Sequence, residues 1–500
     1  MKNIKDVERK RLHKGDYKMN YPIPRPKKLD FTGGTIPVTL EFINTSPIFI
    51  PAIRVFQEYA GHLFGSVENS PTKIELIFQE ELDNGYRISI QNNVVVSASS
   101  TIGMNYALST LLQLAETTDD GVFFPQCEIV DEPDSSWRGV MIDLARCFHE
   151  IEYLYAVADL CWFYKINRFQ IHLTDDQAIR FPLSSLPNAV SDEHYTREQL
   201  TKLVEYCHDR GITIVPEIDA PGHFRAFNTA YPELFGPTNE LEGAETTAQT
   251  NVVSGIMRVQ EETFAIMQQI FKEVTEVFYD SPWIHIGGDE AQINQWDNCS
   301  VSKKYCSEHG LSDIHELYGH CVARFSQMIL DMGRTPVVWE GFSEKTNSMI
   351  PKETLVFSWE SYYQTAPSLL RDGFKIINAS WQPLYIVTPA LMWSTEKILD
   401  WEKNRWEHWW EKSFAYNAPI VTEESPSILG GQICVWGDRM QPSNGYAPRC
   451  EMLRDEFENL RNRVPALAEK TWTSYRTLDK ETFMRDLYYL NDVFDKLINS

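Results

Sequence analysis

The chain has 500 residues, of which 43% are hydrophobic, and a formal net charge of -24 at pH 7. A chain of this length can bury a large core and predicts two domains, one of them of barrel size. The strong negative charge argues against nucleic acid or an anionic membrane as the main partner, because long-range repulsion opposes their encounter. No apolar stretch in the sequence is long enough to span a bilayer.

The first residues, Met1 to Lys18, are rich in Lys and Arg, but no apolar segment follows that can serve as the core of a signal peptide. We therefore expect a cytoplasmic protein. The nine cysteines include no CxxC pair, so they predict neither a disulfide framework nor a zinc site. Cys161 and Cys321 lie in apolar helical patterns and are expected to be buried thiols.

The amino-terminal part of the chain predicts a small α+β domain. Strands are expected at Ile74–Phe78, Tyr86–Ile90 and Val94–Ala98, followed by an amphipathic helix over Ile102–Leu114. The polar segment Asp131–Asp134 contains a proline and precedes a change of pattern. We therefore predict a first domain over residues 1–133, with about the first 20 residues loosely held, and a second domain over residues 134–500.

From Trp137 onward, short β-branched runs alternate with longer helical patterns such as Ile151–Tyr164 and Arg258–Val277. Helical patterns near Arg449–Asn462 and Lys480–Leu497 close the last unit. Eight strands alternating with helices predict a (β/α)8 barrel. The strand candidates are Gly139–Ile142, Arg168–Leu173, Ile212–Ile218, Trp283–Ile286, Pro336–Trp339, Thr354–Trp359, Lys375–Asn378 and Gln432–Trp436.

The hexapeptide His285–Glu290 joins the fourth strand candidate to two glycines and two adjacent carboxylates. Within a strand, Asp289 and Glu290 would point to opposite faces. The two glycines break the strand, so both carboxylates can turn into one cleft. One ionised carboxylate raises the pKa of its neighbour, which keeps a proton donor available at pH 7. The alternative is a solvated acidic turn, since paired carboxylates usually lie on the surface.

Other unusual residues also follow the predicted strands, and a barrel places catalytic groups at the carboxyl ends of its strands. Each one taken alone is better explained by a structural role. Their joint placement at one end of the barrel favours a shared site. They are Asp143 and Arg146, then His172, Asp175 and Asp176, then Asp219 and His223, and finally Trp339, Trp359 and Trp436.

Four ordered motifs resemble those of the β-N-acetylhexosaminidases of glycoside hydrolase family 20. They are Trp137–Gly139 with Asp143 and Arg146, then His172–Gln177, Pro216–His223 and His285–Glu290. The likeness covers almost the whole chain, because residues before Asp131 resemble the small domain that precedes the barrel in that family. The resemblance implies a retaining exo-enzyme that removes terminal N-acetylglucosamine or N-acetylgalactosamine from oligosaccharides or glycoconjugates. It implies no cofactor and no metal.

The resemblance also implies a role for each matching residue. In this family the 2-acetamido carbonyl of the substrate attacks the anomeric carbon, so no enzyme nucleophile is needed. Glu290 is implied to be the general acid and then the base, while Asp289 orients the acetamide and stabilises the oxazolinium charge. The aromatic box around the acetamide methyl group matches Trp339, Trp359 and Trp436, and Tyr385 matches a tyrosine that donates to the acetamide oxygen. Taken alone, each of these aromatic residues can equally be a core residue at the barrel rim.

Arg138 matches the arginine that binds ring hydroxyls, a function that suits a planar fork of donors. An ordinary salt bridge, for example to Asp143, is the alternative. Asp175 and His223 match a pair that positions the acid and adjusts its pKa. Taken alone, a histidine is more often a satisfied core residue. Asp438 matches a glutamate that binds the C4 and C6 hydroxyls, with a side chain one methylene shorter.

The chain departs from the family pattern at three places. Ala178–Ile179 replaces a common Gly-Trp pair, Asp438 replaces the glutamate, and Val387 stands where the family often has Asp. These changes leave the acetamide chemistry intact. They leave open the preference for the gluco or galacto epimer and for the leaving group.

The segment Trp401–Trp410 is helical in composition, and helical spacing puts Trp406, Trp409 and Trp410 on one broad face. We expect either packing on the barrel or a platform for outer sugars or a partner chain, and a homo-oligomer is left open. Two alternative functions are a metal-dependent barrel enzyme that uses the same histidines and carboxylates, and a silent sugar-binding relative. The presence of Glu290 argues against the second.

Overall fold

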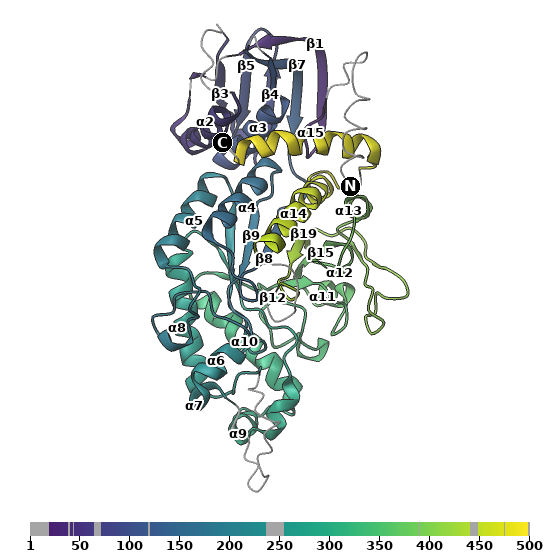
Figure 1. Cartoon of the computed structure of the whole chain (residues 1–500). Helices are drawn as coiled ribbons and strands as arrows, with labels where there is room; N and C mark the ends of the chain where they lie inside the picture. The colour runs from purple at the N-terminus through teal and green to yellow at the C-terminus, as the bar shows by residue number, and fades with distance from the viewer. Residues whose placement is uncertain are drawn as a thin grey trace.

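The computed structural model describes residues 20–498 except 39–40, 44, 65–71, 119–120, 237–254, 390, 441–448 and 475. The basic segment from Met1 to Lys18, which we expect to be loosely held, lies outside the described residues. A mixed sheet begins the described chain, at the top of Figure 1, with the strand order β1-β7-β4-β5-β3-β2 and β6 paired to β7. Its strands are β1 (Lys28–Pro37), β2 (Phe42–Ile43), β3 (Ile74–Phe78), β4 (Tyr86–Ile90), β5 (Val94–Ala98), β6 (Glu116–Thr118) and β7 (Gly121–Asp131).

The helices α2 (Ile50–Phe64) and α3 (Thr101–Leu114) lie between this sheet and the rest of the molecule (Figure 1). Ser100 caps α3 by accepting a hydrogen bond from the backbone N–H of Gly103. Almost every residue of α3 is buried, because one face meets the sheet and the other meets the barrel. Asn105 on α3 accepts a 2.7 Å hydrogen bond from the indole of Trp162 in the barrel. The small domain is therefore joined to the barrel through specific buried contacts.

Eight parallel strands form a closed barrel, because β14 pairs with β19 and β19 pairs with β8. All eight predicted strands are confirmed, as is the (β/α)8 fold. The barrel strands are β8 (Trp137–Asp143), β9 (Arg168–His172), β10 (Thr213–Glu217), β11 (Trp283–His285), β12 (Thr335–Trp339), β13 (Leu355–Ser358), β14 (Lys375–Asn378) and β19 (Ile428–Val435). Because the strands are parallel, all their carboxyl ends meet at one rim.

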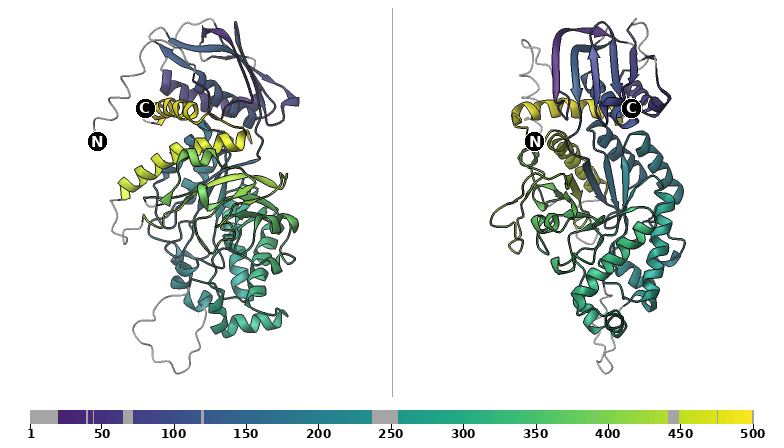
Figure 2. Two further views of the ribbon diagram at one scale, coloured as in Figure 1. Left: turned by 90° about the vertical axis from the view of Figure 1, so that its right-hand side faces the viewer. Right: turned by 180° about the vertical axis from the view of Figure 1, so that it is seen from behind.

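Helices surround the barrel (Figure 2). The long ones bury an apolar face, as amphipathic patterns predict. They are α4 (Ile151–Phe163), α5 (Arg197–Asp209), α8 (Glu261–Val277), α10 (Ile314–Asp331), α14 (Arg449–Trp472) and α15 (Lys480–Ile498). Shorter elements near the strand ends are α6 (Arg225–Ala230), α7 (Pro232–Phe235), α9 (Ser300–Glu308), α11 (Ala366–Arg371), α12 (Trp381–Leu384), α13 (Thr395–Leu399), β15 (Tyr385–Val387), β16 (Leu391–Met392), β17 (Arg405–Trp406) and β18 (Ile420–Val421). Helix α15 runs beneath the small domain (Figure 1).

Arg138 lies at the amino end of β8, where the barrel meets the small domain. Its Nε donates to the carbonyl of Lys165 (2.8 Å), its Nη1 to the carbonyl of Ser135 (2.7 Å) and its Nη2 to the hydroxyl of Tyr106 on α3. Arg138 is 1% exposed. The prediction that this arginine binds a sugar is wrong, because the strand carries its second residue to the rim opposite the carboxyl ends. The alternative of a salt bridge to Asp143 also fails, since that carboxylate pairs with another arginine.

The segment Trp401–Trp410 is not a helix, and this prediction is also wrong. Trp406 lies in β17, which pairs with β18, and its indole donates to the carbonyl of Ser358 at the barrel wall. Asn378 donates to the carbonyls of residues 403 and 405, which holds the backbone extended. Tertiary contacts with the barrel therefore override a helical composition.

The described part of the chain contains no helix that is both long and apolar enough to cross a membrane. Cys161 and Cys321 are buried thiols, as predicted, and none of the described cysteines forms a disulfide. Ala178 and Ile179, which replace a common aromatic pair, are buried residues of the loop after β9, where Ile179 bridges to Thr174.

Candidate active site

The segment His285–Glu290 leaves the barrel at the end of β11. Its two glycines have φ angles of 65° and 81°, in the left-handed region that favours glycine. A Cβ on Gly287 would lie 2.0 Å from Asp219 Oδ1, so no larger residue fits there. Glu290 also has a positive φ of 45°, a conformation that is uncommon for non-glycine residues and enriched at active sites. The resulting turn brings Asp289 and Glu290 to one cavity.

This cavity has a volume of about 360 Å³ and lies at the carboxyl ends of the barrel strands. Four aromatic rings form a box at its base, with neighbouring ring centroids 5.9 to 6.3 Å apart. In order around the box they are Trp339, Trp359, Tyr385 and Trp436. Trp339 closes the box from within the barrel, whereas the other three line the cavity. The predicted aromatic residues therefore come together, although four different parts of the barrel supply them: the end of β12, the loop after β13, β15 and the loop after β19.

Three buried polar atoms at the box have no hydrogen-bond partner among the described residues: Asp289 Oδ1, the Tyr385 hydroxyl and the Trp436 indole nitrogen. Asp289 offers an acceptor and Tyr385 a donor. A buried polar group without a partner costs about 1–3 kcal/mol, so such a set points to a ligand that completes it. An acetamide has an N–H for the carboxylate, a carbonyl for the hydroxyl and an apolar methyl group for the rings.

Arg146 also lines the cavity, and it follows the carboxyl end of β8. Its guanidinium contacts Asp143 at 3.0 Å, Asp175 at 2.8 Å and Asp438 at 3.4 Å, and it lies 5.0 Å from the Trp436 ring centroid. Sequence reasoning placed this residue among the strand-end groups but assigned the sugar-binding role to Arg138. The strand-end rule would have favoured Arg146, because only residues after a barrel strand reach this rim.

Asp175 and His223 connect the barrel interior to Glu290. His223 Nδ1 lies 3.3 Å from Asp175 Oδ1, and His223 Nε2 lies 3.4 Å from Glu290 Oε2. Asp175 in turn contacts His172 Nε2 at 2.9 Å. The predicted supporting pair is thus in contact with the acid, and His172 extends it inward.

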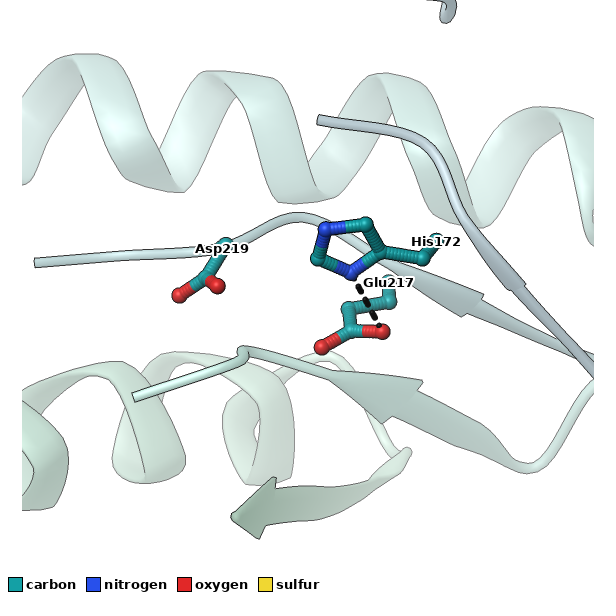
Figure 3. A group of neighbouring side chains, drawn as sticks. All are labelled: His172, Glu217 and Asp219. Atoms are coloured by element: carbon teal, nitrogen blue, oxygen red, sulfur yellow. Dashed lines mark ion pairs between the residues drawn. The ribbon is translucent and has the colours of Figure 1, made fainter. Parts of the chain in front are cut away.

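Glu217, at the end of β10, connects the histidine and carboxylate contacts with the aromatic box. One carboxylate oxygen lies 2.8 Å from His172 Nδ1, as Figure 3 shows, and the other accepts a 2.6 Å hydrogen bond from the Trp339 indole. Gln170 donates a further 2.7 Å hydrogen bond to it. Glu217 is 0% exposed, and a buried carboxylate is tolerated only when it is paired and hydrogen-bonded. Sequence reasoning missed its role, because a strand residue whose partners all come from other strands leaves no local pattern.

Five side chains in contact form a row of alternating charge. They are Glu217, His172, Asp175, His223 and Glu290. Burial works against charge on both members of the first pair, yet Glu217 raises the pKa of His172 well above its ordinary value, and His172 lowers the pKa of Glu217 to about 2. Burial likewise opposes a charge on His223, but Asp175 raises the pKa of this histidine well above its ordinary value. These pKa directions favour an ionised carboxylate on Glu217 and Asp175 and a protonated imidazole on His172 and His223 at neutral pH, with Glu290 at the end of the row.

The two catalytic candidates differ in pKa in the free protein. Burial and the neighbouring Glu290 raise the pKa of Asp289 to about 6, although His223 opposes this rise. Contact with His223 lowers the pKa of Glu290. The sequence predicts an asymmetric pair, with Glu290 protonated and Asp289 ionised. In the free protein the two pKa values are ordered in the opposite sense, because that of Asp289 is raised to about 6 and that of Glu290 is lowered.

Two further residues line the cavity: Glu360, which sequence reasoning missed, and Trp409, which the sequence placed in a possible platform for outer sugars. Glu360 follows the box residue Trp359, and burial together with the nearby Glu290 raises the pKa of its carboxyl to about 9. Trp409 is 49% exposed and lines the cavity mouth. Val387 contributes an apolar wall where the related pattern often has a carboxylate, and Asp438 lies on the rim beside Arg146.

Three groups of histidines and carboxylates bring their ligating atoms within 4.8 Å of one another: His172 with Glu217 and Asp219, Asp175 with Asp176 and His223, and Asp219 with His223 and Asp289. Both ring nitrogens of His172 face carboxylates, and so does Nδ1 of His223. A metal ligand must be a neutral imidazole with a free nitrogen lone pair. Because these three nitrogens already face carboxylates at 2.8–3.3 Å, the arrangement offers few free imidazole lone pairs to a cation and does not favour a metal centre.

Comparison with known proteins agrees with this geometry. The family model described as "Glycosyl hydrolase family 20, catalytic domain" matches residues 136–475, and "Glycosyl hydrolase family 20, domain 2" matches residues 22–132. The chain belongs to glycosyl hydrolase family 20. The predicted resemblance and the prediction of a glycoside hydrolase are thereby confirmed.

Members of family 20 resemble this chain over most of its length. A β-hexosaminidase of Vibrio furnissii is 31% identical over 409 residues, which cover 76% of this chain and 64% of that protein, so the chain spans less than two thirds of that relative. A β-hexosaminidase of Akkermansia muciniphila is 28% identical, covering 81% of this chain and 82% of the relative. The crystal structure of an exo-β-N-acetylglucosaminidase from Vibrio harveyi superposes with a TM-score of 0.77 at 22% identity, covering 96% of this chain and 79% of that one. This last likeness shows a shared fold.

Proposed function

We propose that this member of family 20 is a retaining exo-β-N-acetylhexosaminidase that uses the acetamide of its substrate as the nucleophile. The observation that carries the proposal is the aromatic box with an unpaired Asp289 oxygen and an unpaired Tyr385 hydroxyl at its edge. The box fits an acetamide methyl group, and the two polar atoms fit its N–H and its carbonyl oxygen. Family membership and the β-hexosaminidase relatives support this assignment.

In the first step the acetamide carbonyl oxygen attacks C1 of the terminal sugar while the bond from C1 to the glycosidic oxygen breaks. Glu290 gives its proton to the departing oxygen. Asp289 accepts the acetamide N–H and stabilises the positive charge on the oxazolinium ring. In the second step water attacks C1, Glu290 accepts a proton from this water, and the ring opens to restore the acetamide. Two inversions at C1 give overall retention.

Substrate binding supplies the protonation states that this reaction needs. The acetamide N–H donates to Asp289, which favours the ionised form and opposes its raised pKa of about 6. The sugar also displaces water from Glu290, whose side chain is 51% exposed in the free protein, and desolvation favours its neutral form. The proton held by His223, 3.4 Å from Glu290, can then move to the acid. The asymmetry of the free protein is thus reversed.

Arg146 and Asp438 lie together on the rim and form a donor and acceptor pair for ring hydroxyls. The guanidinium is already held by Asp143 and Asp175, so little side-chain entropy is lost when it binds sugar. Val387, which also lines the cavity, has no side-chain hydrogen-bonding group, and this leaves fewer contacts to distinguish the C4 epimers. We therefore expect turnover of both the gluco and the galacto substrate.

A panel of aryl β-glycosides tests the proposal, with 4-nitrophenyl N-acetyl-β-glucosaminide, its galacto epimer and plain 4-nitrophenyl β-glucoside. We expect both N-acetyl substrates to be cleaved with retention and the plain glucoside to be at least about 1,000-fold slower, because it lacks the nucleophile. Equal turnover of the plain glucoside would exclude substrate assistance. Loss of activity in EDTA that is restored by a divalent cation would favour the metal-dependent alternative. Tight binding without cleavage would favour a silent sugar-binding protein.

A further inference from the structure

The buried residue Glu340 follows the box residue Trp339 at the end of β12 and is 0% exposed. Burial raises the pKa of Glu340 to about 7, and hydrogen bonds from four successive backbone N–H groups oppose this rise by stabilising the carboxylate. The four donors belong to Ser361 (2.8 Å), Tyr362 (3.1 Å), Tyr363 (3.0 Å) and Gln364 (3.2 Å). The carboxylate of Glu340 therefore binds one turn of the chain, residues 361–364.

Glu340 also holds the box tryptophan that precedes this turn. Its carbonyl accepts a 2.7 Å hydrogen bond from the indole of Trp359, and its N–H donates a 2.9 Å hydrogen bond to the carbonyl of Phe357 on β13. All three polar groups of Glu340 thus contact the segment 357–364. Glu340 itself is not among the residues that line the cavity, so it can act on a substrate only through the residues that it holds.

The turn after Trp359 has a backbone conformation that needs support from its surroundings. Ser361 has a φ of 52°, which is uncommon for a non-glycine residue and persists only where neighbouring groups fix it. A second segment supplies further support, because Ser413 Oγ donates a 2.6 Å hydrogen bond to the carbonyl of Glu360. The N–H of Phe414 donates a 2.9 Å hydrogen bond to the carbonyl of Ser361. Glu340 and the segment 413–414 therefore hold this turn together.

We propose that Glu340 is a positioning residue that fixes the width of the aromatic box and thereby selects N-acetyl over longer N-acyl sugars, an inference that rests on the proposed function. Trp339 and Trp359 are neighbouring walls of the box, with ring centroids 6.3 Å apart. A closely packed apolar site accepts an extra methylene only if its walls move. Glu340 holds both the indole of Trp359 and the turn that follows it, so this wall stays in place. A propionyl group, one methylene longer than acetyl, is therefore disfavoured.

The test compares Glu340→Gln with the wild-type chain on 4-nitrophenyl N-acetyl-β-glucosaminide and its N-propionyl analogue. For the wild-type chain, we expect kcat/KM to be at least about 10-fold higher for the N-acetyl substrate, as one methylene in an apolar pocket predicts. The amide group of glutamine presents donors to the backbone N–H groups, so hydrogen bonds are lost and the turn loosens. In Glu340→Gln, kcat/KM for the N-acetyl substrate should fall about 10-fold, mainly through kcat, because the acetamide is held less well for attack. The N-propionyl substrate should lose much less, so the acyl preference narrows.

Two further variants make the result specific. Ser413→Ala loosens the same turn without altering a buried charge, and it should narrow the acyl preference about 2- to 3-fold. Glu469→Gln, the matched control, changes a carboxylate on α14 that is 1% exposed and accepts from the backbone of Arg25. This control should leave the acyl preference unchanged.

The outcomes separate this inference from the proposed function. If the wild-type chain cleaves neither substrate, the proposed function fails and the inference fails with it. If Glu340→Gln lowers kcat/KM equally for both substrates, Glu340 has only a structural role and the inference alone is overturned. A wild-type chain that cleaves both substrates equally well also overturns it. If Glu340→Gln does not fold, an unchanged acyl preference in Ser413→Ala overturns the inference.

Discussion

Two arginines flank strand β8, one buried at its amino end and one partly exposed beyond its carboxyl end. Arg138, at the amino end, lies 5.1 Å from the ring centroids of both Tyr106 and Trp472, and Arg146, beyond the carboxyl end, lies 5.0 Å from that of Trp436. Both are cations over aromatic rings. Arg138 donates to two carbonyls and a hydroxyl, whereas Arg146 contacts three carboxylates and lines the cavity. Burial and residue type therefore do not reveal the function of an arginine, but its position along the strand does.

The same contrast holds for the whole barrel. At the amino end, Lys165 donates to Tyr86 and lies 3.8 Å from Asp131, and burial lowers its pKa to about 8. These charged groups join the barrel to the small domain. At the carboxyl end, the charged groups form a chain that ends at Glu290 and lies beside open space. The first set joins the barrel to the small domain, and the second set connects the barrel interior to Glu290 at the cavity.

The largest expected effect lies at the carboxyl end. Glu290→Gln removes the acid and should lower kcat for chitobiose by about 1,000-fold or more, because its leaving group must be protonated. The loss should be much smaller for 2,4-dinitrophenyl N-acetyl-β-glucosaminide, whose leaving group departs without a proton. Steady-state kinetics on both substrates measure the difference. Equal losses on the two substrates would show that Glu290 is not the acid.

A matched pair of substitutions tests the arginine comparison directly. Arg146→Met should lower kcat/KM by about 100-fold, because charge-assisted hydrogen bonds to the sugar are lost. Arg138→Met should leave kcat/KM within a factor of about two and instead destabilise the fold by about 2–4 kcal/mol, because two carbonyls and a hydroxyl lose their donor. Kinetics and thermal unfolding of both variants separate these effects. A raised KM in Arg138→Met at unchanged stability would overturn the comparison.

A second matched pair compares two buried carboxylates, Glu217 beside the aromatic box and Glu469 on α14. Glu217→Gln keeps an acceptor for the Trp339 indole but removes the counter-ion of His172, so we expect about a 10-fold loss of kcat/KM on chitobiose and a smaller one on the dinitrophenyl glycoside. Glu469 on α14 is equally buried and accepts a 2.6 Å hydrogen bond from the backbone N–H of Arg25. Glu469→Gln, the control, should alter stability without any dependence on the leaving group. A uniform loss in Glu217→Gln would assign this residue a purely structural role.

The smallest expected effect is a shift of the pH profile. For the wild-type chain, kcat/KM should fall as the pH drops through about 6, because Asp289 must be ionised to accept the acetamide N–H. It should fall again at alkaline pH, where His223 loses the proton that it shares with Glu290. Asp175→Asn removes the carboxylate that raises the pKa of His223, so the alkaline limb should move to lower pH while the acid limb stays in place. If the alkaline limb of Asp175→Asn stays in place, the proposed link from Asp175 through His223 to Glu290 is wrong.

Local patterns in the sequence predicted most of the barrel, because strand and helix periods and the Gly287 turn depend on neighbouring residues. They also predicted which residues follow each strand, and hence that Asp289, Glu290 and three tryptophans share a rim. The helix predicted over Trp401–Trp410 was wrong, because Asn378 and the barrel wall hold that backbone extended. Arg138 was misassigned because a motif match ignored which end of the strand it occupies.

The sequence by itself determined the family, the barrel and the residues at the strand ends, since these follow from periodicity and from motifs within short segments. Tertiary structure alone decided which arginine lines the cavity and that Glu217 joins His172 to Trp339. It also decided that Glu290 meets His223 at the edge of the cavity. The physical reason is that these relations join side chains from different strands, where distances and pKa shifts depend on how the barrel closes rather than on any local pattern.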